Sequence, residues 1–586
     1  MKKAYLISLL LLFLGQTLIY SQLPPVFNAE DEASANHSEM VRTYLIPKRI
    51  VWKSDETGSY IKNEETLLQK GNGQVAVNDQ NLFRLISSKE HKPGILLDFG
   101  KELNGGVKIS MGIRPSKTPL KLRVRFGESV SEAMSDIGGK SNATNEHSLR
   151  DFIVEVPWLG SIEIGETGFR FLRIDVVEAN ENAPIKSVEA AFVYRDLDYL
   201  GSFESNNKRL NDIWMTGAYT VHLNMQNYLW DGIKRDRLVW VGDMHPEVMT
   251  INTVFGKNSI VSKSLDLARD QHPLPQWMNT ISSYSMWWLI IHKNWFDYHG
   301  DLDYLKEQET YMIALLDQLS TFIDKDNKEI LNGGRFLDWP TSTDPKAVHA
   351  GLQAMMIMTF EAGSEMMETL GRNDLKKKYQ KISKRLKKHI PEGNTSKQAA
   401  SLMVLADLVK AKKINTEILK KNGVENMSTF YGYYILEAMA KAGDYQGAID
   451  VISEYWGGML DLGATTFWED FNIAEGKISG RIDELSETDK SDIHSDFGDF
   501  CYVGLRHSLA HGWASGPTAW LTQYVLGVNV ENGGNTITVK PHLGDLEFVK
   551  GTFPTKFGIL KVSHTRQPNG KIVTKIDAPE GLKVKQ

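Results

Sequence analysis

The sequence predicts a multidomain fold in which an (α/α)6 toroid is flanked by an N-terminal β-sandwich and a small C-terminal β-domain. Two observations lead to this prediction. Apolar residues alternate with a period of two towards both ends of the chain, and they follow a helical period in between. With 586 residues, the chain is long enough for two to four domains. We expect the β-sandwich over residues 22–200, the toroid over 201–528 and the C-terminal β-domain over 529–586.

The N-terminal β-sandwich is predicted from runs in which every second residue is apolar. Turns rich in Gly, Pro and Asn separate these runs, which is typical of half-buried strands in a sandwich. The apolar members of three runs are Val107, Ile109 and Met111; Leu122, Val124 and Phe126; and Leu172, Ile174 and Val176. The C-terminal domain has the same pattern, for example at Ile537 and Val539.

The toroid is predicted from apolar stripes at helical spacing. Loops marked by Gly300-Asp301 and Gly443-Asp444 separate the stripes, and further helical stretches fall at 398–410, 428–442 and 446–456. Helix pairs over this length can close into a double ring, which leaves a pit where the inter-helix loops converge. The two clearest stripes are Met312, Leu315, Leu316, Leu319, Phe322 and Ile323; and Leu352, Met355, Met356, Ala362, Met366 and Leu370.

The N-terminus has the features of a cleaved signal peptide, expected over residues 1–21. Met1-Lys2-Lys3 precedes an apolar run from Ala4 to Tyr20, and a small residue, Ser21, follows. The alternative is a membrane anchor, but the run is interrupted by polar residues and is short for a bilayer. Cys501 is the single cysteine, so no intramolecular disulfide forms. We expect a periplasmic or secreted protein that is not inserted in a membrane after cleavage.

Composition excludes several functional classes. The net charge is −6 and no long basic run is present, so a nucleic-acid partner is not expected. The chain has no phosphate-binding glycine loop, no paired His or Cys spacing for a metal and no Gly-x-Ser-x-Gly elbow. We expect no cofactor and no metal.

Tryptophan is concentrated in the helical part. Twelve of the 14 tryptophans lie between residues 205 and 525. For any single one, core packing is the better explanation. As a set they favour a carbohydrate cleft, because an indole face can pack on the C–H side of a pyranose.

The densest polar segment runs from Trp230 to Glu247, after a predicted helix at 210–227, with Pro246 placed at the start of the next helix. Its carboxylates can accept hydrogen bonds from vicinal hydroxyls, and arginines can keep such acids ionised. A solvated charged loop is the alternative, but two tryptophans and two glycines argue against it. The charged residues are Asp231, Lys234, Arg235, Asp236, Arg237, Asp243 and Glu247.

Three further segments combine polar and aromatic residues. Glu469 follows Thr465-Thr466-Phe467-Trp468, and Asp338 lies in Phe336-Leu337-Asp338-Trp339-Pro340. His511 precedes Gly512, which allows close approach to a ligand. A lone histidine is more often a satisfied core residue, so each segment alone is weak evidence.

Together these segments resemble the family 78 glycoside hydrolases, the α-L-rhamnosidases. The family loop contains an aspartate, then an acid between two arginines, then Trp-x-Gly-Asp. In this chain the matching residues are Asp231, Arg235, Asp236, Arg237, Trp240, Gly242 and Asp243. The family's Thr-Thr-x-Trp-Glu motif matches residues 465–469, and a sugar-contacting histidine matches His511.

The resemblance implies roles for these residues. Asp236 would be the general acid, Glu469 the general base, and Asp231 and Asp243 would hold the bound rhamnose. Apart from the resemblance, Glu247 is our reserve candidate for the acid. The chain departs from the family in two ways: Ile233 replaces the usual proline, and Asp236 stands where glutamate is more usual. The remaining expected substrate contacts are Arg235, Trp240, Trp288 (or its neighbour Trp287), Asp338 and His511.

The implied function is an exo-acting hydrolase that releases terminal α-L-rhamnose from oligosaccharides or polysaccharide fragments, with inversion. Two alternatives stay open. One is a rhamnoside-binding protein that has lost catalysis, and the other is a toroid hydrolase for another sugar, such as an unsaturated uronide. A general acid must carry a proton at working pH, so the first reading needs Arg235 and Arg237 to point towards partners other than Asp236.

Overall fold

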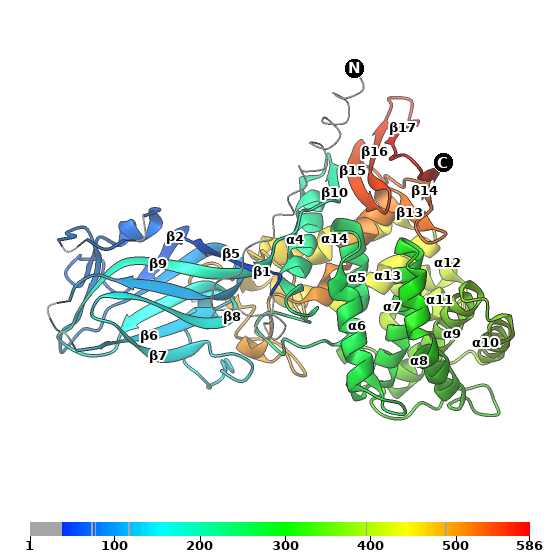
Figure 1. The fold of residues 1–586 in the computed structure, drawn as a ribbon, viewed down its shortest axis with the longest axis horizontal. Helices are drawn as coiled ribbons and strands as arrows, with labels where there is room; N and C mark the ends of the chain where they lie inside the picture. The colour runs from blue at the N-terminus through cyan, green and yellow to red at the C-terminus, as the bar shows by residue number, and fades with distance from the viewer. Residues whose placement is uncertain are drawn as a thin grey trace, which may run out of the picture. The chain divides into compact units, whose positions relative to one another are not determined.

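Antiparallel strands form the N-terminal β-domain (Figure 1). The structure is a computed structural model that describes residues 38–71, 74–76, 78–114, 116, 118–393, 395–486 and 489–586, so the predicted signal peptide lies outside it. The strands pair in the order β3-β4-β9-β5-β8-β6-β7, with β1 beside β9 and β2 beside β5. They are β1 Met40–Leu45, β2 Arg49–Lys53, β3 Ile61–Lys62, β4 Phe83–Ile86, β5 Gly94–Met111, β6 Leu120–Gly127, β7 Asp151–Val156, β8 Gly160–Val176 and β9 Asn182–Arg195.

The apolar residues of the predicted alternation are buried in this domain, and two of the intervening polar residues, Ser110 and Arg125, are buried as well. Val107, Ile109 and Met111 of β5 are fully buried, and their neighbours in the core come from β6 and β8. Burial of one face of each strand is what makes a period-two pattern stable as a sheet.

Helices occupy the chain from α4 to α16. Their ends follow local sequence signals: Gly300 ends α7 with a left-handed φ of 62°, and the Asp301 side chain accepts a hydrogen bond from the Tyr304 N–H at the start of α8. The helices are α4 Lys208–Asn224, α5 Val241–Val254, α6 Ser259–Gln271, α7 Ser282–His299, α8 Leu302–Ser320, α9 Pro345–Thr369, α10 Asn373–Leu386, α11 Lys397–Leu405, α12 Ala411–Ile414, α13 Thr429–Lys441, α14 Tyr445–Asp461, α15 Ile473–Gly476 and α16 Gly516–Trp520.

The helices form a closed double ring. Helices α5, α7, α9, α11, α13 and α16 contact one another in that order, and α16 contacts α5 again. Outside them lie α4, α6, α8, α10, α12 and α14, each in contact with a neighbour of the inner ring. The helical toroid between β-domains is therefore confirmed. One boundary differs from the prediction, because α5 begins at Val241 and Pro246 lies inside it.

The C-terminal strands pack on the ring and share its core. They are β13 Val528–Glu531, β14 Thr536–Val539, β15 Phe548–Thr555, β16 Gly558–Arg566, β17 Ile572–Asp577 and β18 Lys583–Lys585. Strand β10 (Ser202–Ser205), which precedes α4, pairs with β15 in an antiparallel arrangement. Val549 and Leu560 belong to the same buried cluster as the toroid helices. A sheet this small gains a core by packing on the ring.

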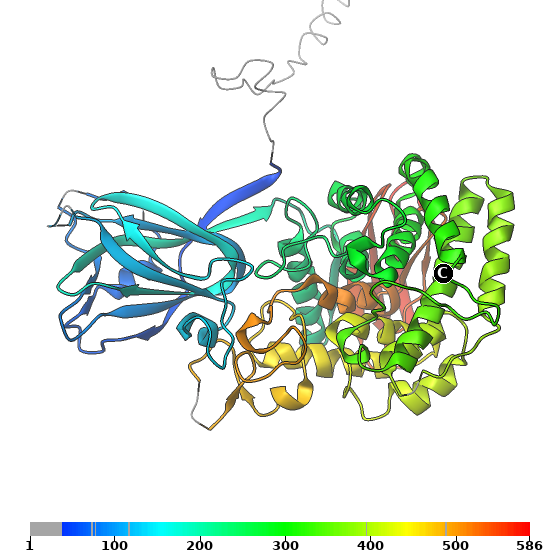
Figure 2. The same ribbon diagram turned by 90° about the horizontal axis from the view of Figure 1, so that it is seen from below.

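A short helix of the β-domain, α3 (Val130–Met134), packs against the helical part of the chain (Figure 2). Ser129, which caps it, lies 2.7 Å from His494 Nδ1, and the Val130 N–H donates to the Ile482 carbonyl. Lys234, in the loop before α5, reaches the same region. Its Nζ lies 3.0 Å from Glu128 Oε2 and 3.2 Å from Glu132 Oε1, and all three side chains are buried.

We expect Lys234→Met to lower the free energy of unfolding by about 3–5 kcal/mol, because it leaves two buried carboxylates without their cation. Burial raises the pKa of Glu128 to about 7, so Glu128→Gln in the same chain should recover part of the loss. Thermal unfolding followed by circular dichroism measures both variants. Lys208→Met is the control, since Lys208 forms an exposed pair with Asp212 and should cost less than about 1 kcal/mol. Equal losses for Lys234→Met and Lys208→Met would contradict the expectation.

No helix among the described residues is both long and apolar enough to cross a membrane.

Candidate active site

A cavity of about 330 Å³ lies where inner helices of the toroid begin. Asp243 is in the first turn of α5, Tyr284 is in the first turn of α7, and Trp513 lies just before α16. The free N–H groups of a helix start favour negative charge and oxygen acceptors nearby. Of the nine site residues predicted from sequence, seven line this cavity: Asp231, Arg235, Asp236, Trp240, Asp243, Glu469 and His511.

The loop between α4 and α5 is closed by hydrogen bonds. The Asp231 N–H donates to the Leu238 carbonyl at 3.0 Å, and the Leu238 N–H donates to Asp231 Oδ1 at 2.9 Å. Asp236 and Arg237 at its tip have left-handed φ values of 52° and 58°. Two successive left-handed residues reverse the direction of the chain. The Arg237 guanidinium points away from Asp236, as the acid assignment requires, and its Nη2 lies 2.7 Å from Glu166 Oε1. Arg235 does not point away, because its Nε lies 3.6 Å from Asp236 Oδ1. The expectation that both arginines turn to other partners is met for Arg237 alone.

Asp231, Asp243 and His511 form a buried polar group on one wall. Burial raises the pKa values of Asp231 and Asp243 well above the ordinary range. The nearby charges of Asp243 and Asp236 raise the pKa of Asp231 further. Burial lowers the pKa of His511 to about 4, so its ring is neutral. His511 Nε2 lies 2.9 Å from Asp243 Oδ1, so the two side chains share a hydrogen bond. These groups can accept and donate hydrogen bonds to sugar hydroxyls.

Arg235 joins the two candidate catalytic acids. Its Nη1 lies 3.2 Å from Glu469 Oε2, and its Nε lies 3.6 Å from Asp236 Oδ1. Glu469 Oε2 also accepts from the Ser508 N–H at 3.2 Å, while its Oε1 lies 4.0 Å from His511 Nδ1. Glu469 therefore has one oxygen held by donors and one near the neutral imidazole of His511.

The aromatic wall is a chain of edge contacts. Trp240 lies against Tyr284 with ring centres 6.1 Å apart, Tyr284 against Phe336 at 6.3 Å, and Phe336 against Trp339 at 5.1 Å. Gly242 permits the first of these contacts, because a side-chain carbon there would lie 2.3 Å from the Tyr284 ring. Flat apolar faces beside carboxylates are the surface that a pyranose ring requires.

Comparison with known proteins identifies the family. A family model described as the bacterial alpha-L-rhamnosidase six-hairpin glycosidase domain matches residues 198–525, more than half of the chain. The chain belongs to this α-L-rhamnosidase family. The match covers the whole helical ring and the candidate cavity. No curated protein matches the chain.

Solved rhamnosidase structures have the same fold. The family 78 rhamnosidase of Bacillus sp. GL1 is 19% identical, with a TM-score of 0.71, over 86% of this chain and 54% of its own. The α-L-rhamnosidase of Dictyoglomus thermophilum is 20% identical, with a TM-score of 0.67, over 84% of this chain and 56% of its own. The chain thus spans about half the length of these two. A Klebsiella oxytoca rhamnosidase with rhamnose bound is 19% identical, with a TM-score of 0.64, over 83% of this chain and 96% of its own.

Within this rhamnosidase fold, two predicted substrate contacts lie outside the cavity. Trp288 is fully buried, and its Nε1 donates to the Leu265 carbonyl at 3.0 Å; its neighbour Trp287 is buried against His245 and Tyr434. Their helix, α7, faces the cavity only at its first turn, through Tyr284. The expected substrate contact at Trp288 (or Trp287) is therefore corrected: the aromatic side chains that line the cavity are Trp240, Tyr284, Phe336, Trp339 and Trp513.

Asp338 is also placed behind the cavity. Its carboxyl accepts hydrogen bonds from the Ser428 hydroxyl and from the Trp339 N–H, so it links the start of α13 to the indole that lines the cavity. Burial raises the pKa of Asp338 to about 7. The acid in this segment was predicted from sequence, whereas the adjacent Trp339 makes the wall.

Glu247, the reserve candidate for the general acid, is fully buried and does not line the cavity. Its Oε1 accepts from Asn224 Nδ2 at 3.1 Å. A side-chain carbon at Gly512 would overlap this oxygen, so the carboxyl lies directly against the backbone of residue 512. Burial raises the pKa of Glu247 well above its ordinary value. The position of the Glu247 carboxyl indicates a structural role, in which it holds the backbone of residues 511–513 in place.

We expect Asp338→Asn to change how stability depends on pH. A carboxyl with a raised pKa stabilises the fold below its unfolded pKa near 4, and this contribution is lost as pH rises towards 7. Asparagine stays neutral, so any deficit in melting temperature of the variant at pH 5 should shrink or reverse at pH 8. Differential scanning fluorimetry at both values measures this, with exposed Asp212→Asn as the control. A melting-temperature difference that is constant with pH would contradict it.

One group of acidic and histidine side chains among the described residues is close enough to share a metal: Glu128, Glu132 and His494. Lys234 already neutralises the two carboxylates. Both ring nitrogens of His494 are engaged as well, 2.7 Å from Ser129 Oγ and 2.9 Å from the His507 carbonyl. This set is therefore satisfied by the protein itself.

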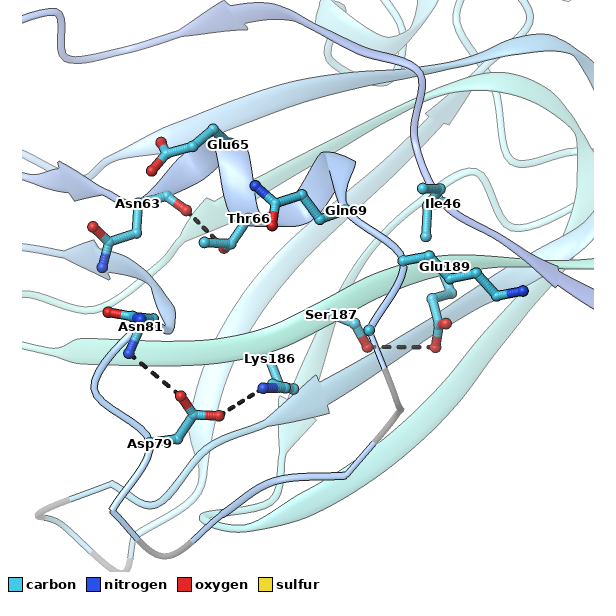
Figure 3. A pocket seen from close by; sticks show the side chains of 12 residues that line it. Ile46, Asn63, Glu65, Thr66, Gln69, Asp79, Asn81, Lys186, Ser187 and Glu189 are labelled. Atoms are coloured by element: carbon cyan, nitrogen blue, oxygen red, sulfur yellow. Dashed lines mark hydrogen bonds and ion pairs between the residues drawn. The ribbon is translucent and has the colours of Figure 1, made fainter.

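A second cavity, of about 550 Å³, lies on the N-terminal β-domain (Figure 3). Its polar side chains pair with one another: Asp79 Oδ2 lies 2.6 Å from Lys186 Nζ, and the Ser187 hydroxyl donates to Glu189 Oε2 at 3.4 Å (Figure 3). The described residues that line it include no aromatic ring. This surface therefore lacks the sugar-stacking faces of the first cavity.

Proposed function

We propose that the protein is an exo-acting α-L-rhamnosidase that releases terminal α-L-rhamnose from oligosaccharides or polysaccharide fragments, with inversion. The observation that carries the proposal is the placement of Asp236 and Glu469 around one guanidinium, that of Arg235, in a single cavity. Membership of the rhamnosidase family and the rhamnose bound to the Klebsiella oxytoca relative support the choice of sugar.

In this mechanism Asp236 gives its proton to the glycosidic oxygen, and the bond from that oxygen to the anomeric carbon breaks. Glu469 takes a proton from a water whose oxygen bonds to the anomeric carbon from the opposite face. Inverting enzymes place the two carboxyl groups about 6.5–9.5 Å apart so that this water fits. Arg235 stabilises the negative charge of Glu469 that proton removal requires.

The size of the cavity supports an exo mode of action. About 330 Å³ is at the lower end of ligand pockets, which suits one sugar ring rather than an internal polymer segment.

Asp231 and Asp243 would hold the ring hydroxyls. We expect Asp231→Ala and Asp243→Ala each to lower kcat/KM by about 10²-fold or more, since hydrogen bonds to desolvated acids are strong. Steady-state kinetics on an aryl rhamnoside measures this. Leu238→Ala, an exposed position in the same loop, is the control and should leave kcat/KM unchanged. Folded Asp231 and Asp243 variants with near wild-type kcat/KM would assign these acids to structure.

The experiment that tests the function is an assay of purified protein on three substrate classes. These are 4-nitrophenyl α-L-rhamnoside, rhamnose-terminated oligosaccharides and unsaturated uronides. Release of β-L-rhamnose first, seen by proton NMR, supports an inverting rhamnosidase. Turnover of unsaturated uronides alone would support the other toroid hydrolase. Rhamnose binding by calorimetry without turnover of any substrate would support the binding protein.

We also propose export to the periplasm with cleavage near Ser21-Gln22, on the strength of the N-terminal sequence. Mass spectrometry of protein from a periplasmic extract tests this. An intact Met1 in a membrane fraction would overturn it.

A further inference from the structure

A loop of the N-terminal β-domain reaches the candidate acid. His147, which precedes β7, has its Nδ1 3.1 Å from Asp236 Oδ1, and the two side chains are only 22% and 20% exposed. The next residue anchors the loop, since the Ser148 hydroxyl donates to the Lys234 carbonyl at 3.2 Å. The contact thus joins two domains, through residues far apart in the sequence.

The contacts of the imidazole fix which nitrogen carries the proton. Arg506 Nη2 lies 3.1 Å from His147 Nε2, and a guanidinium can only donate, so Nε2 is the acceptor. A neutral ring then has its proton on Nδ1, and the Nδ1–H donates to Asp236 Oδ1. Burial lowers the pKa of His147, the Asp236 charge opposes this shift, and the cations Arg235 and Arg506 add to it. The remaining facing charge, Glu146, is paired with Arg506 at 2.9 Å.

The other oxygen of the same carboxyl is held as well. Trp240 Nε1 donates to Asp236 Oδ2 at 3.1 Å. Asp236 therefore has a donor on each oxygen, one from the toroid and one from the β-domain. Two donors at fixed positions define the plane of the carboxyl, on a backbone that is itself in a left-handed conformation.

We propose that His147 is a positioning residue for the general acid: its Nδ1–H orients the Asp236 carboxyl and stabilises the carboxylate left after proton transfer. This inference rests on the proposed function. In the step, the proton of Asp236 moves to the glycosidic oxygen, that oxygen leaves the anomeric carbon with the bonding electron pair, and His147 keeps its own proton. Solvent later returns a proton to Asp236, while Glu469 releases the one it took from water.

The test compares His147→Leu, His147→Asn and His147→Gln in the full chain. Asparagine places an amide N–H near the position of Nδ1, whereas glutamine places one near Nε2. His147→Leu and His147→Gln should lower kcat on a rhamnosyl disaccharide by about 10-fold or more with little change in KM, because a hydrogen bond to a charged group is lost. His147→Asn should stay within about 3-fold of wild type. Leu149→Ala, exposed on the same loop, is the control.

Two further readouts separate positioning from a structural role. The loss in His147→Leu should be smaller on 4-nitrophenyl α-L-rhamnoside, whose leaving group needs little protonation. The alkaline limb of the kcat/KM–pH profile should move to higher pH, because the carboxylate has lost a donor.

Three outcomes decide the matter. An active wild type with His147→Leu equal to Leu149→Ala on both substrates overturns the role of His147 and leaves the proposed function standing. If His147→Leu does not fold, the asparagine and glutamine variants decide, and equal activity of the two overturns the role. A wild type that is inactive on every rhamnoside overturns the proposed function, and the inference with it.

Discussion

Glu469→Gln should lower kcat/KM by about 10³-fold on both an activated aryl rhamnoside and a rhamnosyl oligosaccharide. Water must lose a proton whatever the leaving group, and glutamine cannot accept it. The surroundings of Glu469 favour this role, because Arg235 and the Ser508 N–H hold Oε2 while Oε1 lies nearer His511, outside hydrogen-bond range. Glutamine is close in shape, so the loss should fall on kcat.

Asp470→Asn is the matched control, since Asp470 is an acid at the next position but does not line the cavity. Burial raises the pKa of Asp470 to about 6. A small anion can replace a missing base, so azide should restore turnover of 4-nitrophenyl α-L-rhamnoside by Glu469→Ala and yield a rhamnosyl azide of inverted configuration. A folded Glu469→Gln variant that keeps a tenth of wild-type activity would remove the base role from Glu469.

Most helices and strands could be predicted from local sequence patterns. The features that could not be predicted depend on contacts between residues far apart in the sequence. Apolar periodicity and the signals at Gly300 and Asp301 predicted strands and helices, because burial and capping act on neighbouring residues. The pairing of β10 with β15 joins residues about 350 positions apart and has no local signal. Pro246 was expected at a helix start, yet α5 begins at Val241, with Asp243 in its first turn.

The candidate site could be predicted where acids lie close together in sequence. Asp231, Asp236 and Asp243 fall in one loop, and all three line the cavity. The aromatic wall was harder to predict, because most of α7 is buried and the sequence pattern does not show which of its residues face the cavity. Tyr284 lies one helical turn before Trp288, and only the first turn of α7 reaches the cavity.

His147 had no signal in the sequence. It lies in a loop of another domain, 89 positions before Asp236, and its importance arises only from how the β-domain packs on the ring. The sequence shows only the near neighbours of Asp236, which are the two arginines and the acids Asp231 and Asp243. The structure turns Arg237 away, keeps Arg235 at 3.6 Å from the carboxyl, and adds the imidazole.

Asp236→Asn should lose about 10³-fold in kcat/KM on a rhamnosyl oligosaccharide and less than about 10-fold on 4-nitrophenyl α-L-rhamnoside. A sugar alkoxide is a poor leaving group that needs the proton of the acid, whereas nitrophenolate leaves without one. The loss should therefore grow along a series of aryl rhamnosides as the leaving phenol becomes less acidic. A plot of log kcat/KM against the phenol pKa should be steeper for the variant than for wild type.

The control for this variant is Glu166→Gln, which changes the exposed partner of Arg237 at the outer side of the same loop tip and should leave both activities unchanged. Asparagine can still accept from His147 through its carbonyl, but its NH2 group then faces Trp240 Nε1, so the melting temperature of the variant must be checked against wild type. Equal losses on the two substrates in a folded variant would remove the acid role from Asp236. Glu247 could not take over the acid role, because its carboxyl lies behind the backbone of Gly512 and outside the cavity. Asp231 or Asp243 would then be the group to test, because burial raises the pKa of both carboxyls.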